Sequence, residues 1–147
     1  IGIMVLEYSI FMLTAWILYP DYMAGISGIL SMGNAFAFML VCLSIAFLAG
    51  RQAKNDGQLN MMANVVGLAF SFLGGVFVPL ELMNQGMQKI AKFVPSYWYV
   101  SSNTAIWKIK SWSEAGEIYR NEFVMLLFAA AVFAVALMLN RLRARKS

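Results

Sequence analysis

The residues that could carry out acid–base or metal chemistry are few in this chain and are scattered along it. The carboxylates Glu7, Asp21 and Asp56 fall at different levels of the sequence, whereas catalysis would need acids and bases that converge. The absence of histidine removes the commonest general base and the commonest zinc ligand. No Gly-x-x-x-x-Gly-Lys-Ser/Thr phosphate loop is present, so ATP cannot be bound by that route. The sequence therefore predicts no enzyme, and neither a cofactor nor a metal bound by this chain.

Polar side chains also occur inside apolar blocks. A carboxylate at membrane depth is costly and usually faces a partner or a wet cavity, so Glu7 is a candidate functional residue. The alternative is that Glu7 lies near the cytoplasmic end of its helix and reaches water. Asn34, Asn64 and Ser71 could line a substrate path, but interhelical hydrogen bonds that hold a bundle together are their commoner role.

The composition indicates that these side chains lie in a membrane protein. Apolar residues make up 61% of the chain and charged residues 12%, and the mean hydropathy is +0.71. Soluble domains contain about half apolar and a quarter charged residues. A chain of 147 residues has too little interior to hide this much apolar surface from water. We therefore expect an all-α integral membrane protein.

The apolar blocks predict about four transmembrane helices within one domain, residues 1–147. The predicted spans are residues 1–19, 25–50, 59–80 and 123–139. An outer amphipathic segment is predicted for residues 81–121, and a basic tail for residues 141–147. Because the chain begins inside an apolar run without a methionine, we expect it to be the C-terminal portion of a longer protein.

Basic residues near the span ends predict the topology. Arg51 and Lys54 lie in the polar hinge between two spans, and two further crossings bring the tail to the same side. The positive-inside rule places both in the cytoplasm. The outer segment also carries basic residues, namely Lys89, Lys92, Lys108, Lys110 and Arg120, so the density of charge in the tail decides the prediction. We interpret the basic residues as topology signals and contacts to anionic lipid, not as a nucleic-acid surface.

The outer segment is expected to lie in the membrane interface. Over residues 81–93 the apolar side chains can gather on one helical face and the polar side chains on the other, a pattern typical of an interfacial helix. Tyr97 and Trp98 have the amphipathic rings that favour headgroup depth. Pro79 can end the preceding span, and Pro95 interrupts the segment.

Two sequence stretches resemble a known family. Residues 72–83 read FLGGVFVPLELM, and residues 90–98 read IAKFVPSYW. Together they resemble the ABC-2 type permeases, the membrane subunits of ATP-driven exporters. The resemblance implies that this chain holds spans three to six, and that the first two spans and the coupling helix between the second and third are missing from it. It also implies two partners, a nucleotide-binding ATPase subunit that carries the ATP and a second permease copy or a homologous permease.

The resemblance assigns roles to several residues. Arg51, Lys54 and Asp56 would contact the ATPase subunit, although an ordinary short loop explains them equally well. A re-entrant pair would shape the outer gate, and its residues would be Pro79, Glu81, Pro95, Tyr97 and Trp98. The Gly74-Gly75 pair could be a gating hinge, or could simply allow close contact between helices.

The predicted function is a permease subunit that exports an amphipathic substrate, such as a drug, an antibiotic, a lipid or a glycan. The spans offer apolar and weakly polar surface without a ring of charges, which favours such substrates. The family is chiefly bacterial, so we expect a multi-pass protein of the bacterial plasma membrane. Two alternatives remain open. One is a membrane assembly or anchoring subunit without a transport path, and the other is a membrane-embedded lipid-modifying enzyme.

Overall fold

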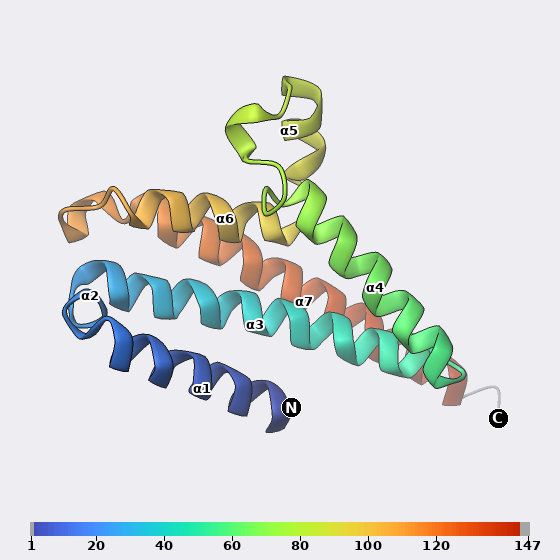
Figure 1. Ribbon diagram of the computed structural model, residues 1–147. Helices are drawn as coiled ribbons and strands as arrows, with labels where there is room; N and C mark the ends of the chain where they lie inside the picture. The colour runs from blue at the N-terminus through green and yellow to red at the C-terminus, as the bar shows by residue number, and fades with distance from the viewer. Residues whose placement is uncertain (1, 145–147) are drawn as a thin grey trace.

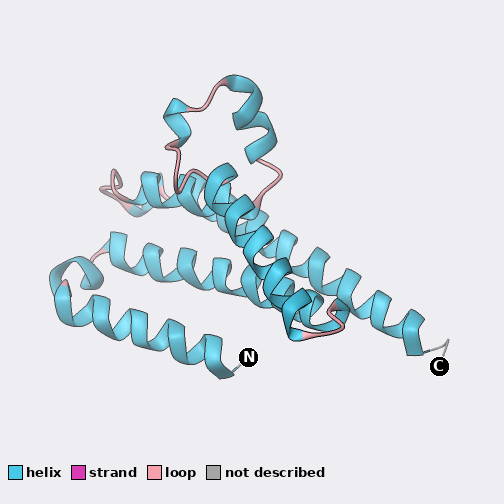
Figure 2. Cartoon of the chain, turned by 45° about the vertical axis from the view of Figure 1, so that its right-hand side comes forward, coloured by secondary structure: helices cyan, strands magenta, loops and turns pink. Residues whose placement is uncertain are grey.

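The computed structural model describes residues 2–144, and every regular element in that part of the chain is a helix (Figures 1 and 2). The α-helices are α1 (Gly2–Leu18), α2 (Pro20–Ala24), α3 (Ile26–Gln52), α4 (Asp56–Leu73), α5 (Gln85–Ala91), α6 (Pro95–Ile106) and α7 (Gly116–Ala144). Two short 3₁₀ turns, η1 (Leu80–Leu82) and η2 (Trp112–Glu114), complete the set. The prediction of an all-helical chain is confirmed.

Within residues 2–144, two helices are long and apolar enough, by length and composition, to cross a membrane. They are α3, with 27 residues, and the stretch Gly116–Leu142 of α7, also with 27 residues. At 1.5 Å per residue, each is about 40 Å long, which exceeds the roughly 30 Å hydrocarbon core. The first helix, α1, is apolar but has 17 residues.

The core of the bundle is formed by α3, α6 and α7. Figure 1 shows α3 and α7 running side by side in the same direction, with α6 against both, and α1 beside the first part of α3. The buried residues of α3 that face the core recur at a helical spacing of three and four residues: Leu30, Asn34, Ala37, Val41 and Ser44. This spacing places them on one stripe of the helix, which packs mainly on α7.

Helix α4 diverges from α3 after the turn between them, and α5 stands apart from the bundle (Figures 1 and 2). Asn55 is the N-cap of α4, because its side chain accepts a hydrogen bond from the backbone N–H of Gln58 at 2.8 Å. The helix ends at Leu73, seven residues before the end of the predicted span 59–80. Gly75 then has a φ of +90°, a left-handed conformation that favours glycine and that stops the helix.

The predicted outer segment, residues 81–121, is divided among five elements: η1, α5, α6, η2 and the start of α7. Asn84 caps a new helix by accepting from the backbone N–H of Met87 at 2.8 Å, so residues 81–93 do not form one continuous helix. As a result their apolar residues do not share one face: Ala91 is buried, whereas Leu82 and Phe93 are exposed.

Helix α7 begins at Gly116, seven residues before the predicted span 123–139. Its first two turns are amphipathic and bury Ile118 and Asn121 against the rest of the bundle. The turn between α3 and α4 and the C-terminal end of α7 lie at the same end of the molecule (Figure 1). Of the predicted tail 141–147, residues 141–144 continue α7, and residues 145–147 lie outside the described residues.

Candidate functional site: a pocket and a polar layer

A pocket of about 690 Å³ opens between α1, α2, α3 and α6. It lies toward the end of the bundle opposite the α3–α4 turn. The lining residues are Phe11, Met12, Thr14, Ala15, Leu18, Tyr19, Tyr22, Met23, Ser31, Ala35, Tyr99, Asn103 and Trp107. Most of this wall is apolar or aromatic, with a few hydroxyl and amide groups among the rings. Such a wall suits a guest that is itself amphipathic.

The polar groups of the pocket are held in place by contacts between helices. The hydroxyl groups of Tyr22 and Ser31 form a hydrogen bond of 2.9 Å. The ring of Tyr22 also packs against Trp107, with ring centroids 5.6 Å apart. Asn103 accepts a hydrogen bond at its side-chain oxygen from the amide of Asn34, at 2.9 Å. These contacts join α2, α3 and α6 around the pocket.

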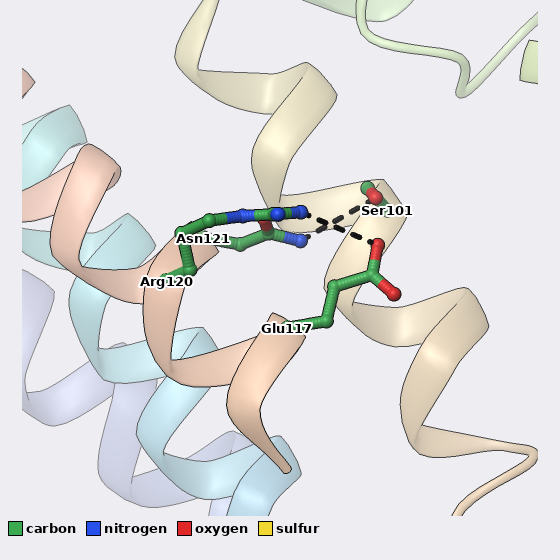
Figure 3. Close-up of polar contacts among 4 residues, drawn as sticks. All are labelled: Ser101, Glu117, Arg120 and Asn121. Atoms are coloured by element: carbon green, nitrogen blue, oxygen red, sulfur yellow. Dashed lines mark hydrogen bonds and ion pairs between the residues drawn. The ribbon is translucent and has the colours of Figure 1, made fainter. Parts of the chain in front are cut away.

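A second set of polar residues lies behind the pocket wall, where α6 meets α3 and α7. The Asn34 side-chain amide donates to the Tyr99 carbonyl at 3.1 Å, in addition to its bond with Asn103. On the other side of α6, the Asn121 amide donates to the Ser101 hydroxyl at 3.4 Å (Figure 3). Both asparagines are fully buried. They therefore attach α6 to its two neighbours by hydrogen bonds.

Several oxygen atoms in the same region are buried without a hydrogen-bond partner among the described residues. They are the side-chain carbonyl oxygens of Asn34 and Asn121, the hydroxyl of Ser102 and one carboxylate oxygen of Glu122. We call these four residues the polar layer. A buried polar group without a partner is costly, so the layer is unlike ordinary helix packing.

Most of the polar layer was not predicted from the sequence. Asn34 was predicted as a candidate, but Ser102, Asn121 and Glu122 were not. Glu122 fell on the boundary between the predicted outer segment and the last predicted span. A signal that could have found it resembles the one applied to Glu7: Glu7 is a carboxylate inside an apolar run, and Glu122 is a carboxylate directly before one.

The remaining polar candidates of the apolar blocks lie elsewhere. Asn64 is exposed on α4. Ser71 is half-buried near the end of α4, where its backbone carbonyl accepts from the N–H groups of Val76 and Phe77 at 3.2 and 3.0 Å. The structure therefore brings Asn34 to the pocket, but not Asn64 or Ser71.

Glu7 is exposed on α1. Its neighbour Tyr8 donates a hydrogen bond to the carbonyl of Met32 at 3.0 Å and packs edge-to-face on Phe36. Glu7 is therefore level with the first half of α3, far from the α3–α4 turn. Within residues 2–144 it forms no ion pair or hydrogen bond. The prediction that Glu7 has a functional role stays a prediction.

The charged residues of the polar hinge, Arg51, Lys54 and Asp56, are exposed at the α3–α4 turn. Arg51 lies over the ring of Phe47, with its guanidinium carbon 5.2 Å from the ring centroid. The backbone N–H of Lys54 donates to the side chain of Gln58 at 2.8 Å, and Asp56 begins α4. The turn is thus a short, capped connection whose charged residues are exposed.

The predicted outer-gate residues fall into two groups. Pro79 and Glu81 are exposed near η1. Pro95 is buried at the first position of α6, where its fixed φ suits a helix start. Tyr97 and Trp98 follow it, packed edge-to-face with ring centroids 5.3 Å apart. The last three therefore lie together at the start of α6.

Replacing Asn34 by leucine is expected to lower the free energy of unfolding by about 1–3 kcal/mol, because the Tyr99 carbonyl and the Asn103 side chain would lose their donor while staying in the bundle. Thermal unfolding of the full-length protein in detergent measures this loss. The double variant with Asn103→Leu serves as the control. Its loss should be smaller than the sum of the two single losses. Additive losses would contradict the bond.

Comparisons with known proteins found a family and a relative with similar sequences. The family model for the ABC-2 type transporter matches residues 1–107. The linearmycin resistance permease protein LnrN of Bacillus subtilis (strain 168) is 27% identical over 100 residues, which are 68% of this chain and 26% of that protein. The chain thus spans about a quarter of the length of this relative. No solved structure matches the chain.

Proposed function

Because this chain belongs to the ABC-2 type transporter family, we propose that it is a permease subunit of an ATP-driven exporter of amphipathic molecules. The observation that carries the proposal is the pocket between α1, α2, α3 and α6, since it combines an apolar, aromatic wall with a few hydroxyl and amide groups. Such a wall would accommodate a drug, an antibiotic, a lipid or a glycan with an apolar part. The relative in Bacillus subtilis is named as a resistance permease, which agrees with the export of a small molecule.

In this proposal α1, α3, α4 and α7 cross the membrane. The lengths of α1 and α4, 17 and 18 residues, correspond to about 26–27 Å, close to the hydrocarbon thickness. The stretch from η1 to α6 forms a re-entrant outer element. Its support is that α6 begins at a buried proline and then runs back along α3 and α7 toward the outer end, the end opposite the α3–α4 turn.

The α3–α4 turn and the end of α7 face the cytoplasm of a bacterial cell in this proposal, since both carry basic residues at one end of the bundle. The ATPase subunit contacts the turn through Arg51, Lys54 and Asp56. ATP then drives transport because it interacts differently with the inward-open and outward-open conformations.

A second permease copy packs on α4 in this proposal. The helix has no buried residue, and Asn60, Asn64 and Gly67 are all exposed on it. Their spacing of four and three residues places them on one face. Polar and small side chains on one face of a membrane helix are typical of helix–helix contacts, because they allow close approach and hydrogen bonding.

Filling the pocket tests the transport path. Ala35 lines the pocket, and we expect Ala35→Trp to reduce export by about tenfold or more, the effect of losing at least 1.4 kcal/mol of substrate interaction. The assay is ATP-dependent export of fluorescent amphipathic dyes and antibiotics from proteoliposomes that hold the full-length protein and its ATPase.

The matched control is Ala46→Trp, on the exposed surface of the same helix and outside the pocket. This variant should export normally. Unchanged export by Ala35→Trp would show that the pocket is not the path. Export by the permease without any ATPase would show that transport is not driven by ATP.

A further inference from the structure

The wall of the pocket between α1, α2, α3 and α6 is uncharged. Within residues 2–144, none of the residues that line it is Asp, Glu, Lys or Arg. Asp21 and Lys108 are the charged residues next in sequence to lining residues, but both are exposed and neither belongs to the wall. A charged group that leaves water needs an opposite charge close by. The wall therefore favours an uncharged guest.

Asn103 offers hydrogen-bond donors to such a guest. The Tyr99 carbonyl can only accept, so Asn34 presents its side-chain amide there, and the same amide donates to the side-chain oxygen of Asn103 at 2.9 Å. The N–H groups of the Asn103 side chain form no hydrogen bond within residues 2–144. They are not among the buried atoms that lack a partner. They are therefore accessible, on a residue that lines the pocket.

The hydroxyl groups of Tyr22 and Ser31 add a further donor. The two groups share one hydrogen bond of 2.9 Å, which uses one of their two hydrogens. The other hydrogen has no acceptor within residues 2–144. Because both residues line the same pocket as Asn103, the wall presents several donors that the protein does not satisfy. Such donors suit a guest with ester, ether or hydroxyl oxygens.

The rim of the pocket is apolar and exposed. Phe11, Leu18 and Trp107 line the pocket, yet between 62% and 77% of their surface is exposed. They lie on α1 and at the C-cap of α6, and these two helices flank α3 in both views (Figures 1 and 2). In the proposed function α1 and α3 cross the membrane, and this end of the bundle is the outer one. The rim then faces lipid, so the pocket opens sideways into the outer half of the bilayer.

We propose that the pocket binds an uncharged, lipid-like amphiphile through the oxygen atoms of its polar part, and exchanges it with the lipid of the outer half of the bilayer. The volume of about 690 Å³ lies within the roughly 300–1,000 Å³ of pockets for drug-sized ligands. It suits one polar group with part of a chain, while the rest of the chain stays in the lipid beyond the rim. The inference rests on the proposed function, because the rim faces lipid only if α1 and α3 cross the membrane.

The test uses a photoactivatable diacylglycerol with long chains, added to the full-length protein in nanodiscs. This probe is uncharged, carries ester and hydroxyl oxygens, and stays in the bilayer, so it reaches the pocket only through lipid. Mass spectrometry is expected to find crosslinks at the pocket residues of α1 and α6. An excess of unlabelled diacylglycerol should suppress them, whereas phosphatidylglycerol and a trimethylammonium lipid with the same chains should not.

Replacing Asn103 by aspartate tests the donors and the charge of the wall together. Asn103→Asp retains an oxygen that can accept from Asn34, but exchanges the free N–H groups for a carboxylate oxygen. In mildly alkaline buffer, labelling of the pocket by the diacylglycerol probe should fall by about tenfold or more. A photoactivatable trimethylammonium lipid should label this variant instead. Asn140→Asp is the matched control, because it makes the same change at an exposed position of α7 outside the pocket.

If Asn103→Asp does not assemble, Ser31→Ala replaces it. This variant removes one hydroxyl of the pair with Tyr22 and should weaken the labelling by about two- to tenfold. Pocket crosslinks that phosphatidylglycerol suppresses as well as diacylglycerol does, or the absence of any suppressible crosslink in the pocket, would overturn the inference.

The binding measurements need neither ATPase nor export, so the inference and the proposed function fail separately. A pocket that binds diacylglycerol selectively in a protein that exports nothing would contradict the proposed function alone. ATP-driven export of charged and uncharged amphiphiles alike, without selective binding in the pocket, would contradict the inference alone.

Discussion

Replacing Gly28 by alanine is expected to lower the free energy of unfolding by about 2–3 kcal/mol, the upper range for adding one methyl group to a packed site. Gly28 is buried in the first turn of α3. An added Cβ would overlap the α-carbon and carbonyl of Met23 and the carbonyl of Tyr22. These are backbone atoms, which cannot rotate away as a side chain would. The whole of α2 would have to move from α3, and with it the Tyr22 side of the pocket.

Thermal unfolding of the full-length protein measures this effect. Gly50→Ala is the control on the same helix, because a Cβ at Gly50 meets no atom within 4 Å. It should be neutral or slightly stabilising, since alanine favours a helix over glycine by roughly 0.5–1 kcal/mol. If both variants unfold at the same temperature, the close contact between α2 and α3 does not exist in the protein.

Replacing Gly74 by alanine is expected to have the second large effect, a loss of about 1–3 kcal/mol. Gly74 is the C-cap of α4, and a Cβ there would overlap the Ser96 side chain and the Phe70 carbonyl. Ser96 is buried, with 2% of its surface exposed, and donates a hydrogen bond to the same carbonyl at 2.9 Å. It therefore has no space into which it can move, and α4 would separate from α6.

A second substitution distinguishes this contact from a general effect of alanine at a helix end. Ser96→Gly removes both side-chain atoms that the Cβ of Gly74→Ala would overlap. Although it also loses the bond to Phe70, the double variant should unfold at a higher temperature than Gly74→Ala alone. A double variant that is less stable than either single variant would contradict the proposed packing.

The contact between the end of α4 and α6 shows what the sequence could and could not predict about Gly74-Gly75. The glycine pair suggested either a hinge or a close contact, and both remained open from the sequence. In the structure, Gly74 lies in close contact with α6, and Gly75 has the left-handed backbone that ends α4. The choice depended on Ser96, which is distant in the sequence and gives no local signal.

The long helices α1, α3, α4 and α7 were predictable because each contains a long apolar run. The runs of α3 and α7 can be recognised from length and hydropathy alone. The division of residues 81–93 into two helical elements, in contrast, depends on a single N-cap residue, Asn84. Capping bonds are local and short, so a hydrophobic pattern averaged over a whole segment hides them.

The candidate site was less predictable than the helices. Asn34 was found because it is polar within an apolar run, but its partners Tyr99 and Asn103 are 65 and 69 residues away. Nothing in the helical period of α6 indicates which face meets α3 and which meets α7. Glu122 was missed for a related reason, since its carboxylate lies against Gly33 of another helix, 89 residues before it in the sequence.

The central claim is that this chain works as the permease subunit of an ATP-driven exporter. Its most direct test is purification of the full-length tagged protein from its native cells in a gentle detergent, followed by an ATPase assay on the proteins that come with it. The account predicts a stoichiometric nucleotide-binding partner with vanadate-sensitive ATPase activity and two permease copies in each complex. A homogeneous preparation without partner or ATPase activity would contradict it and favour an anchoring subunit or a lipid-modifying enzyme.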